Sequence, residues 1–179
     1  MKKGIGAADR EAIRVWLERL TAGDADDLGP SLDYPRLGAG KHRIVYDVGD
    51  GRVLKVALVA KGIECNAREE SLYRKAPPEL RKHLCPVLAA GPGWLVMKKL
   101  TKPMPRGRRY KRGLRRILKL AESHGVRISD IFSRRTGNPK RNNVRLSSRG
   151  RIVLIDYANL YPSGDGRIMS FLRRSAGRE

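Results

Sequence analysis

The sequence contains no long apolar run. No window approaches the roughly eighteen consecutive apolar residues that a membrane-spanning helix requires, and the N-terminal segment carries acids where a secretory signal peptide would be apolar. We therefore expect no membrane partner and a cytoplasmic location.

Cysteines and aromatic residues are scarce. Cys65 and Cys85 are the only cysteines, and they show neither the spacing of a metal site nor that of a disulfide framework, which is typical of a reducing compartment. Aromatic residues make up 6% of the chain, so we expect a core built mainly from Leu, Ile, Val and Ala. A length of 179 residues is enough for one domain with a buried core.

Acidic residues are absent between Met97 and Lys119, although this stretch is rich in lysine and arginine. The whole chain carries a formal net charge of +21 and has a pI near 10.8, which indicates an anionic partner: nucleic acid, nucleotide phosphates or an acidic protein. A solvated helix face is the alternative. Tyr110 is the only aromatic residue in the stretch, so phosphate contacts are favoured over base stacking. The residues expected to bind a polyanion are Arg106, Arg108, Arg109, Lys111, Arg112, Arg115 and Arg116.

Hydrophobic periodicity divides the chain into helices and strands. β-Branched residues on both sides of an Asp-Gly turn predict a hairpin within residues 36–60, and Pro77 and Pro78 predict a break in the chain. The expected helices are residues 9–21, 62–75, a segment that ends at His124 and Gly125, and a short helix near 168–173. The expected strands are 36–40, 43–48, 53–59, 84–88, 94–97 and a hairpin over 144–155.

Two glycines stand at the first bend of the strand region, in the segment LGAGKHRIVY. Because Gly38 and Gly40 lack side chains, backbone N–H groups there can approach phosphate oxygens closely, although an ordinary tight turn would use the same residues. Lys55 lies inside the next strand among apolar neighbours, which is unfavourable for a charge unless a partner meets it. A lysine that reaches solvent from an edge strand is the alternative.

The helix that follows offers carboxylates to this lysine. Among Glu64, Glu69 and Glu70, Glu69 fits best because it lies one turn before the apolar Leu72, and it would hold the ammonium against nucleotide phosphates. Much later in the chain, Asp156 ends an apolar strand. Its carboxylate and the amide of Asn143 would supply oxygen ligands to a hard cation such as Mg²⁺.

This order of elements resembles the protein-kinase-like superfamily over residues 36–160. A glycine turn, a strand lysine, a helix glutamate, the apolar strand WLVM, a helix, an Asn and a strand-end Asp follow one another as in that family, with its common spacing of thirteen residues between Asn143 and Asp156. The resemblance implies an α+β fold: an antiparallel N-terminal sheet with one helix, then a truncated C-terminal lobe.

The resemblance also implies roles for individual residues, with ATP and Mg²⁺ as cofactors. Val45 would pack on adenine, and Lys55 would pair with Glu69 and orient the phosphates. The implied cofactor-binding residues are Gly38, Gly40, Arg43, Val45, Lys55 and Met97. The implied metal ligands are Asn143 and Asp156, and the implied catalytic residues are Asp130, Lys55 and Glu69.

The sequence also departs from the family. Arg43 stands where the third glycine usually lies, so the loop either clasps phosphate less tightly or adds a guanidinium to it. Tyr157 and Ala158 replace the Phe and Gly of the family's D-F-G triplet. Only 23 residues follow Asp156. We therefore expect no full activation segment and no peptide-binding helical lobe, as in small bacterial or phage kinase-like proteins.

The sequence leaves two positions open for the catalytic base. In the family an Asp lies five residues before the metal-binding Asn, and here that position holds Asn138, whose amide cannot accept a proton as a carboxylate does. Asp130 follows the strand-like segment VRIS and is the favoured alternative, with extra residues inserted before Asn143. A helix N-cap or a loop acid would have the same local sequence.

We divide the chain into an N-terminal helix and loop, residues 1–35, and a minimal kinase-like domain, residues 36–179, with lobes at 36–100 and 101–179. The predicted function is an ATP-dependent phosphotransferase that acts on protein Ser or Thr. The alternative is a catalytically degenerate module, a pseudokinase, whose basic surface binds nucleic acid or an acidic protein. A small-molecule kinase for cationic acceptors is disfavoured by the basic segment after Met97.

Overall fold

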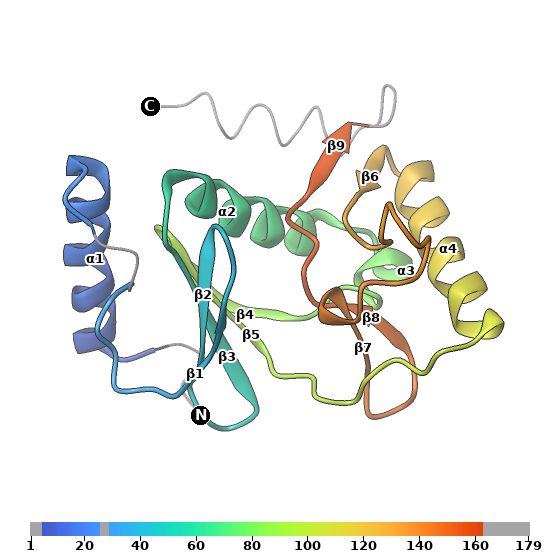
Figure 1. Ribbon diagram of the computed structural model, residues 1–179, viewed down its shortest axis with the longest axis horizontal. Coiled ribbons are helices and arrows are strands. Elements are labelled where there is room, and N and C mark those ends of the chain that lie inside the picture. The colour runs from blue at the N-terminus through green and yellow to red at the C-terminus, as the bar shows by residue number, and fades with distance from the viewer. Residues whose placement is uncertain (1–4, 26–28, 163–179) are drawn as a thin grey trace. The chain divides into compact units, whose positions relative to one another are not determined.

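The computed structural model of the chain describes residues 5–25 and 29–162. The predicted helix near residues 168–173 lies outside them. The described residues form two compact units (Figure 1): the first contains the residues up to Glu70 together with Pro86–Lys99, and the second contains Ser71–Cys85 together with the residues from Leu100 onward. Within the described ranges, no helix combines the length and the apolar character needed to cross a bilayer.

A five-stranded antiparallel sheet forms the centre of the first unit, as the sequence predicts. Its strand order is β1-β2-β3-β5-β4. The hairpin between β2 and β3 turns where three successive residues, Gly49, Asp50 and Gly51, have positive φ, which explains the preference for glycine and aspartate there. The strands are β1 (Arg36–Ala39), β2 (Arg43–Asp47), β3 (Arg52–Ala57), β4 (Val87–Gly91) and β5 (Trp94–Lys98).

The two faces of this sheet carry different side chains, because successive residues of a strand point to opposite sides. Lys55 is paired in register with Val45 of β2 and Leu95 of β5, so these three residues share one face. The other face is apolar and belongs to the main hydrophobic cluster of the first unit. Its buried residues are Ile44, Tyr46, Leu54, Val56, Trp94 and Val96.

Helix α1 (Ala7–Ala22) packs on the apolar face of the sheet. Ile13 and Trp16 are buried in the same cluster, and the Trp16 indole Nε1 donates a hydrogen bond of 2.9 Å to the Ala57 carbonyl of β3. The helix ends at Gly23, whose φ of 82° is left-handed, as expected for a glycine C-cap. The predicted helix over residues 9–21 is therefore confirmed, and the structure adds its attachment to the sheet.

Replacing Trp16 with phenylalanine is expected to lower the free energy of unfolding by about 1–3 kcal/mol, because the buried Ala57 carbonyl loses its indole donor. Chemical denaturation monitored by circular dichroism would measure this change. Val15, which is 43% exposed on the same helix, supplies the control: Val15→Ala should change stability by less than about 0.5 kcal/mol. Equal effects of the two substitutions would show that the indole contact contributes nothing.

Helix α2 (Ala60–Lys75) begins in the first unit, and its last residues, Ser71–Lys75, belong to the second. Its Glu69 contacts Lys55, so α2 lies on the face of the sheet opposite α1. The helix starts two residues before the predicted residue 62. Gly62 lies close to the chain around it: a Cβ there would be 2.1 Å from the His42 carbonyl oxygen, so only glycine fits.

The position of one strand was predicted wrongly. The strand predicted over residues 84–88 is instead β4 (Val87–Gly91), because proline has no N–H for the sheet ladder at Pro86 and the tight turn lies at Pro92 and Gly93. The predicted break at Pro77 and Pro78 is confirmed, because α2 ends at Lys75 and Pro77 is extended. Pro78 starts the short helix α3 (Pro78–Arg81), where the missing N–H of a first-turn proline costs nothing.

The second unit combines one long helix with short strand pairs. Helix α4 (Arg108–Ser123) ends before His124 and Gly125 as predicted, and it buries Leu114, Ile117 and Ala121. The predicted hairpin is present as β7 (Val144–Leu146) and β8 (Ile152–Leu154), preceded by the 3₁₀ turn η1 (Arg141–Asn143). Strand β9 (Leu160–Pro162) pairs with β6 (Val126–Ile128) and is not predicted from the sequence.

Candidate functional site

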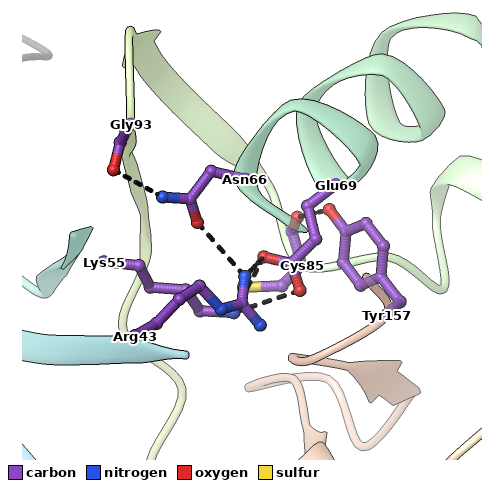
Figure 2. A network of polar contacts seen from close by, with 7 residues as sticks. All are labelled: Arg43, Lys55, Asn66, Glu69, Cys85, Gly93 and Tyr157. Atoms are coloured by element: carbon purple, nitrogen blue, oxygen red, sulfur yellow. Dashed lines mark hydrogen bonds and ion pairs between the residues drawn. The ribbon is translucent and has the colours of Figure 1, made fainter. Parts of the chain in front are cut away.

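The centre of the candidate site in the first unit is a buried ion pair. Lys55 on β3 is 7% exposed and Glu69 on α2 is 0% exposed. The Lys55 Nζ lies 2.9 Å from one carboxylate oxygen of Glu69 and 3.2 Å from the other (Figure 2). Burial of this kind requires both charges to be paired, since an isolated buried charge is strongly unfavourable. The structure therefore brings together the lysine and the one glutamate that the sequence favoured.

Arg43 provides a second cation to the same carboxylate. Its guanidinium Nη1 lies 2.9 Å from Glu69 Oε2 and 3.2 Å from the Asn66 side-chain oxygen (Figure 2). Asn66 in turn donates a 2.8 Å hydrogen bond to the Gly93 carbonyl. The sequence predicts Arg43 only as part of the phosphate loop, and Asn66 is not among the site residues predicted from it. The signal for Asn66 was available, because it lies one turn before Glu69 on the same helix face.

The predicted glycine turn connects β1 and β2. Gly38 is paired with Val45, and the Gly40 N–H donates a 2.9 Å hydrogen bond to the Arg43 carbonyl. Both glycines are exposed, and a Cβ built on Gly38 would meet nothing within 4 Å. The turn is therefore open to solvent, and its tight backbone is held by its own hydrogen bonds.

Two other predicted nucleotide-binding residues share the sheet face of Lys55. Val45 is directly opposite Lys55 in the β2–β3 register and is partly buried. Met97 is paired with Val53, two residues before Lys55, and is 1% exposed. The fold thus places Val45, Lys55 and Met97 on one face of the sheet. The glycine turn joins β1 and β2 of the same sheet.

The second unit contains a separate cluster around Asp130. The Asn143 side-chain nitrogen donates hydrogen bonds of 2.7 Å to the Asp130 backbone carbonyl and 3.3 Å to its carboxylate. Lys140 forms an ion pair with the same carboxylate. Asp130 has a φ of 66°, a left-handed conformation that is uncommon for residues other than glycine and that is often found at functional sites. Lys140 is not among the site residues predicted from the sequence.

Asn138, the other candidate for the catalytic base, is placed differently. It is exposed, and its backbone carbonyl accepts a 2.8 Å hydrogen bond from the Ser133 N–H within the loop. Its own backbone N–H donates a 3.3 Å hydrogen bond to the Thr136 hydroxyl oxygen. The structure therefore joins Asp130 to Asn143 and leaves Asn138 in the surface turn.

Asp156 follows β8 and is partly buried. The Ile155 N–H, immediately before it, donates a 2.9 Å hydrogen bond to the Asn143 carbonyl, which extends the β7–β8 pairing by one step. This backbone contact brings the chain at Asn143 next to the chain at Asp156. Tyr157 is fully buried, and its hydroxyl donates a 2.9 Å hydrogen bond to the Cys85 carbonyl (Figure 2).

Asn143 and Asp156 are the predicted oxygen ligands for a cation. Within the described ranges, no group of three or more His, Cys, Asp and Glu side chains gathers as a metal site. Asn143 uses its amide nitrogen for Asp130, so its amide oxygen is the atom that suits a metal ion. An amide oxygen and the carboxylate of Asp156 are hard ligands, the type that Mg²⁺ prefers.

The predicted polyanion-binding residues lie on α4 or just before it. Six of them are exposed, and Lys111 is partly buried. The Arg115 guanidinium stacks over the Phe132 ring, 5.8 Å from its centroid. The six exposed residues are Arg106, Arg108, Arg109, Arg112, Arg115 and Arg116.

Two shifted pKa values belong to residues outside these clusters. The hydrogen bond from Lys99, 2.6 Å from the Asp47 carboxylate, lowers the pKa of Asp47. Burial lowers the pKa of His83, whose Nδ1 lies 2.9 Å from the Ile152 carbonyl oxygen. His83 is therefore expected to be neutral near pH 7 and to tie the chain before β4 to β8 in the second unit.

The fold is similar to those of solved kinase structures. The bifunctional kinase-methyltransferase WbdD aligns with a TM-score of 0.55 and 20% identity, over 82% of this chain and 37% of that chain. A structure of monomeric WbdD gives a TM-score of 0.55 at 20% identity, over 83% and 41%. The Legionella pneumophila Lpg2603 kinase bound to IP6 gives 0.48 at 17% identity, over 76% and 53%.

The chain thus spans less than half the length of the WbdD structures that it matches. Comparison of the sequence with protein-family models and with curated proteins gives no match.

Proposed function

Because the chain has a protein-kinase-like fold, we propose that it binds Mg-ATP and transfers the γ-phosphoryl group to a Ser or Thr hydroxyl of a protein. The observation that carries the proposal is the buried pair of Lys55 and Glu69. A strand lysine held by a helix carboxylate is the arrangement that positions phosphates in such enzymes. Soluble proteins seldom bury a lysine without a specific use for its charge.

In the first unit, each predicted residue has a defined task in this proposal. Lys55 orients the phosphates, and Glu69 holds its ammonium in place. Arg43 shares Glu69 and so helps to fix the carboxylate, rather than only reaching into the phosphate loop. Val45 and Met97 offer an apolar surface to adenine. The backbone N–H groups around Gly38 and Gly40 donate hydrogen bonds to phosphate oxygens.

In the second unit, Asn143 and Asp156 are the proposed Mg²⁺ ligands and Asp130 is the proposed base. Bound Mg²⁺ would neutralise charge that develops on the phosphate oxygens. Asp130 accepts the hydroxyl proton as the acceptor oxygen bonds to the γ-phosphorus and the bond to the bridging oxygen breaks, which releases ADP. Asn143 supports this task, because its hydrogen bonds hold both the backbone and the carboxylate of Asp130.

A second candidate function is a nucleotide-binding module without phosphotransfer, whose basic surface contacts an anionic partner. The ion pair between Lys140 and Asp130 favours this candidate, because the ammonium occupies the carboxylate that would have to accept the hydroxyl proton. The two candidates differ in one measurable property. Both bind nucleotide, but only the first consumes ATP in the presence of an acceptor.

The test measures Mg-ATP binding by calorimetry and phosphate transfer from radiolabelled ATP to the protein itself and to a Ser/Thr peptide library. We expect binding and transfer, with transfer reduced by at least about 10²-fold in Asp156→Asn, since loss of a metal ligand removes several kcal/mol of charge stabilisation. Asp33→Asn, at an exposed position in the first unit, is the matched control. Binding without transfer would support the second candidate, and absence of Mg-ATP binding would refute both.

A further inference from the structure

The net positive charge of the chain is concentrated in one of its two units. In the described part of the second unit, residues 71–85 and 100–162, there are 21 lysines and arginines. The same residues include four acids, Glu79, Glu122, Asp130 and Asp156. The described part of the first unit has 12 lysines and arginines and 10 acids, so it is nearly neutral. The net charge of the whole chain does not show this difference between the two units.

Helix α4 places many of these cations on one side. At 100° per residue, six cations between Arg108 and Lys119 fall within an arc of about 120° and along a length of about 17 Å. All six are exposed, and none of them forms an ion pair with a described carboxylate. We call these residues the α4 basic face: Arg108, Arg109, Arg112, Arg115, Arg116 and Lys119.

The packing of α4 excludes two common partners of basic amphipathic helices. Such a helix binds a membrane surface or a helix-binding groove through its apolar side. Here the apolar side is occupied, because Leu114, Ile117 and Ala121 are buried in the second unit. Only the charged side remains accessible, so the partner must be recognised by its negative charge.

The density of the charge favours nucleic acid over an acidic protein. Six cations in about 17 Å amount to one positive charge per 3 Å or so, and duplex DNA carries one negative charge per 1.7 Å or so of its axis. A folded protein surface generally mixes charges of both signs. Base stacking is not supported. Tyr110 is partly buried, and the face of the Phe132 ring is covered by Arg115.

We propose that the α4 basic face binds the phosphate backbone of double-stranded nucleic acid without reading its sequence. The loop after Asp130 extends this surface, because Phe132 contacts Arg115 and the exposed Arg134 and Arg135 follow directly. This inference rests on charge and packing in the second unit, and it holds whether or not the chain transfers phosphate.

The test is fluorescence anisotropy with labelled 20-base-pair DNA and RNA duplexes at several salt concentrations, without ATP. With about six phosphate contacts, a plot of log Kd against log salt concentration should have a slope of about 5. Affinity should therefore fall about 10³-fold between 50 and 200 mM salt. The triple substitution Arg109→Gln, Arg112→Gln and Arg116→Gln should lower this slope by about 3. Similar results for unrelated duplex sequences are expected, since phosphates carry no sequence information.

The matched control is Arg10→Gln, Arg19→Gln and Lys98→Gln, which removes the same charge from exposed positions in the first unit. It should keep most of the salt dependence. Hydrogen exchange should also show protection of residues 108–119 in the wild-type protein when duplex is added, and thermal unfolding should show that both triple variants are folded. Equal losses in the two variants, or equally tight binding to polyglutamate, would overturn the proposal.

Discussion

Replacing Glu69 with alanine is expected to lower the free energy of unfolding by about 3–5 kcal/mol. Glu69 is fully buried and accepts hydrogen bonds from both Lys55 and Arg43, whose side chains are 9% and 10% exposed. Removal of the carboxylate leaves two largely buried cations facing each other, and breaking a buried ion pair from one side has a cost of this size. Urea denaturation of the purified variant would measure the change.

Glu64 is a matched control on the same helix. Its side chain is 53% exposed, and its carboxylate pairs with Lys61 and Arg68 at the surface. Its pKa is lowered mainly by the hydrogen bond from Lys61, but solvent screens this exposed cluster, so Glu64→Ala should cost less than about 1 kcal/mol. If Glu69→Ala costs no more than Glu64→Ala, the central role given to the buried pair is wrong.

Simultaneous replacement of all three charged residues tests the cause of this effect. The combined variant Arg43→Met, Lys55→Met and Glu69→Leu removes together the three charges that pair with one another in this cluster. Apolar replacement of a complete buried ion network is often neutral or stabilising. The combined variant should therefore recover most of the stability that Glu69→Ala loses, although it should have no phosphotransfer activity under the proposed function. Failure to recover would point to lost packing instead of unpaired charge.

Replacing Asp130 with asparagine is expected to lower kcat for phosphotransfer by about 10²–10⁴-fold, the usual contribution of a general base. Asparagine tolerates the left-handed backbone at this position, where φ is 66°, so the fold should be retained. The KM for ATP should change little, because Asp130 is proposed to act on the acceptor hydroxyl and not on the nucleotide. Steady-state kinetics over a range of ATP concentrations would separate the two constants.

Asn138→Ala distinguishes the two positions that the sequence left open. Asn138 is exposed and forms hydrogen bonds with Ser133 and Thr136 of its own loop, so its removal should change kcat by less than about twofold. This prediction depends on the proposed phosphotransfer. A larger loss of kcat in Asn138→Ala than in Asp130→Asn would reverse the assignment of the base.

The local sequence was sufficient for most of the secondary structure. The period of apolar residues predicted α1, α2 and α4, and the Asp-Gly turn and its flanking β-branched residues predicted the β2–β3 hairpin. The errors occurred in segments whose strand structure depends on pairing with another strand. Strand β4 begins after Pro86, where its pairing with β5 starts, and the three-residue strand β9 has no pattern of its own without β6.

The same division applies to the candidate site. Lys55 and Glu69 were identifiable because an isolated charge in an apolar strand and a carboxylate at helical spacing leave local marks in the sequence. For Arg43, the local sequence indicated only a position in the phosphate loop. Its turn toward Glu69 and Asn66 depends on the strand register of β2 and on the position of α2, which are both set by contacts between residues that are distant in the chain.

By itself, the amino-acid sequence determined the order of the elements and the size of the positive charge, and it favoured Lys55 and Glu69 as a pair. The order of the elements and an isolated charge in a strand depend on residues within a few turns of chain, and the net charge depends on composition alone. The tertiary structure alone decided that Asn143 holds Asp130 and not Asn138, that Arg43 shares Glu69, and that the apolar side of α4 is buried while its basic side is exposed. These outcomes depend on which distant segments pack together, and the packing of distant segments has no local signature.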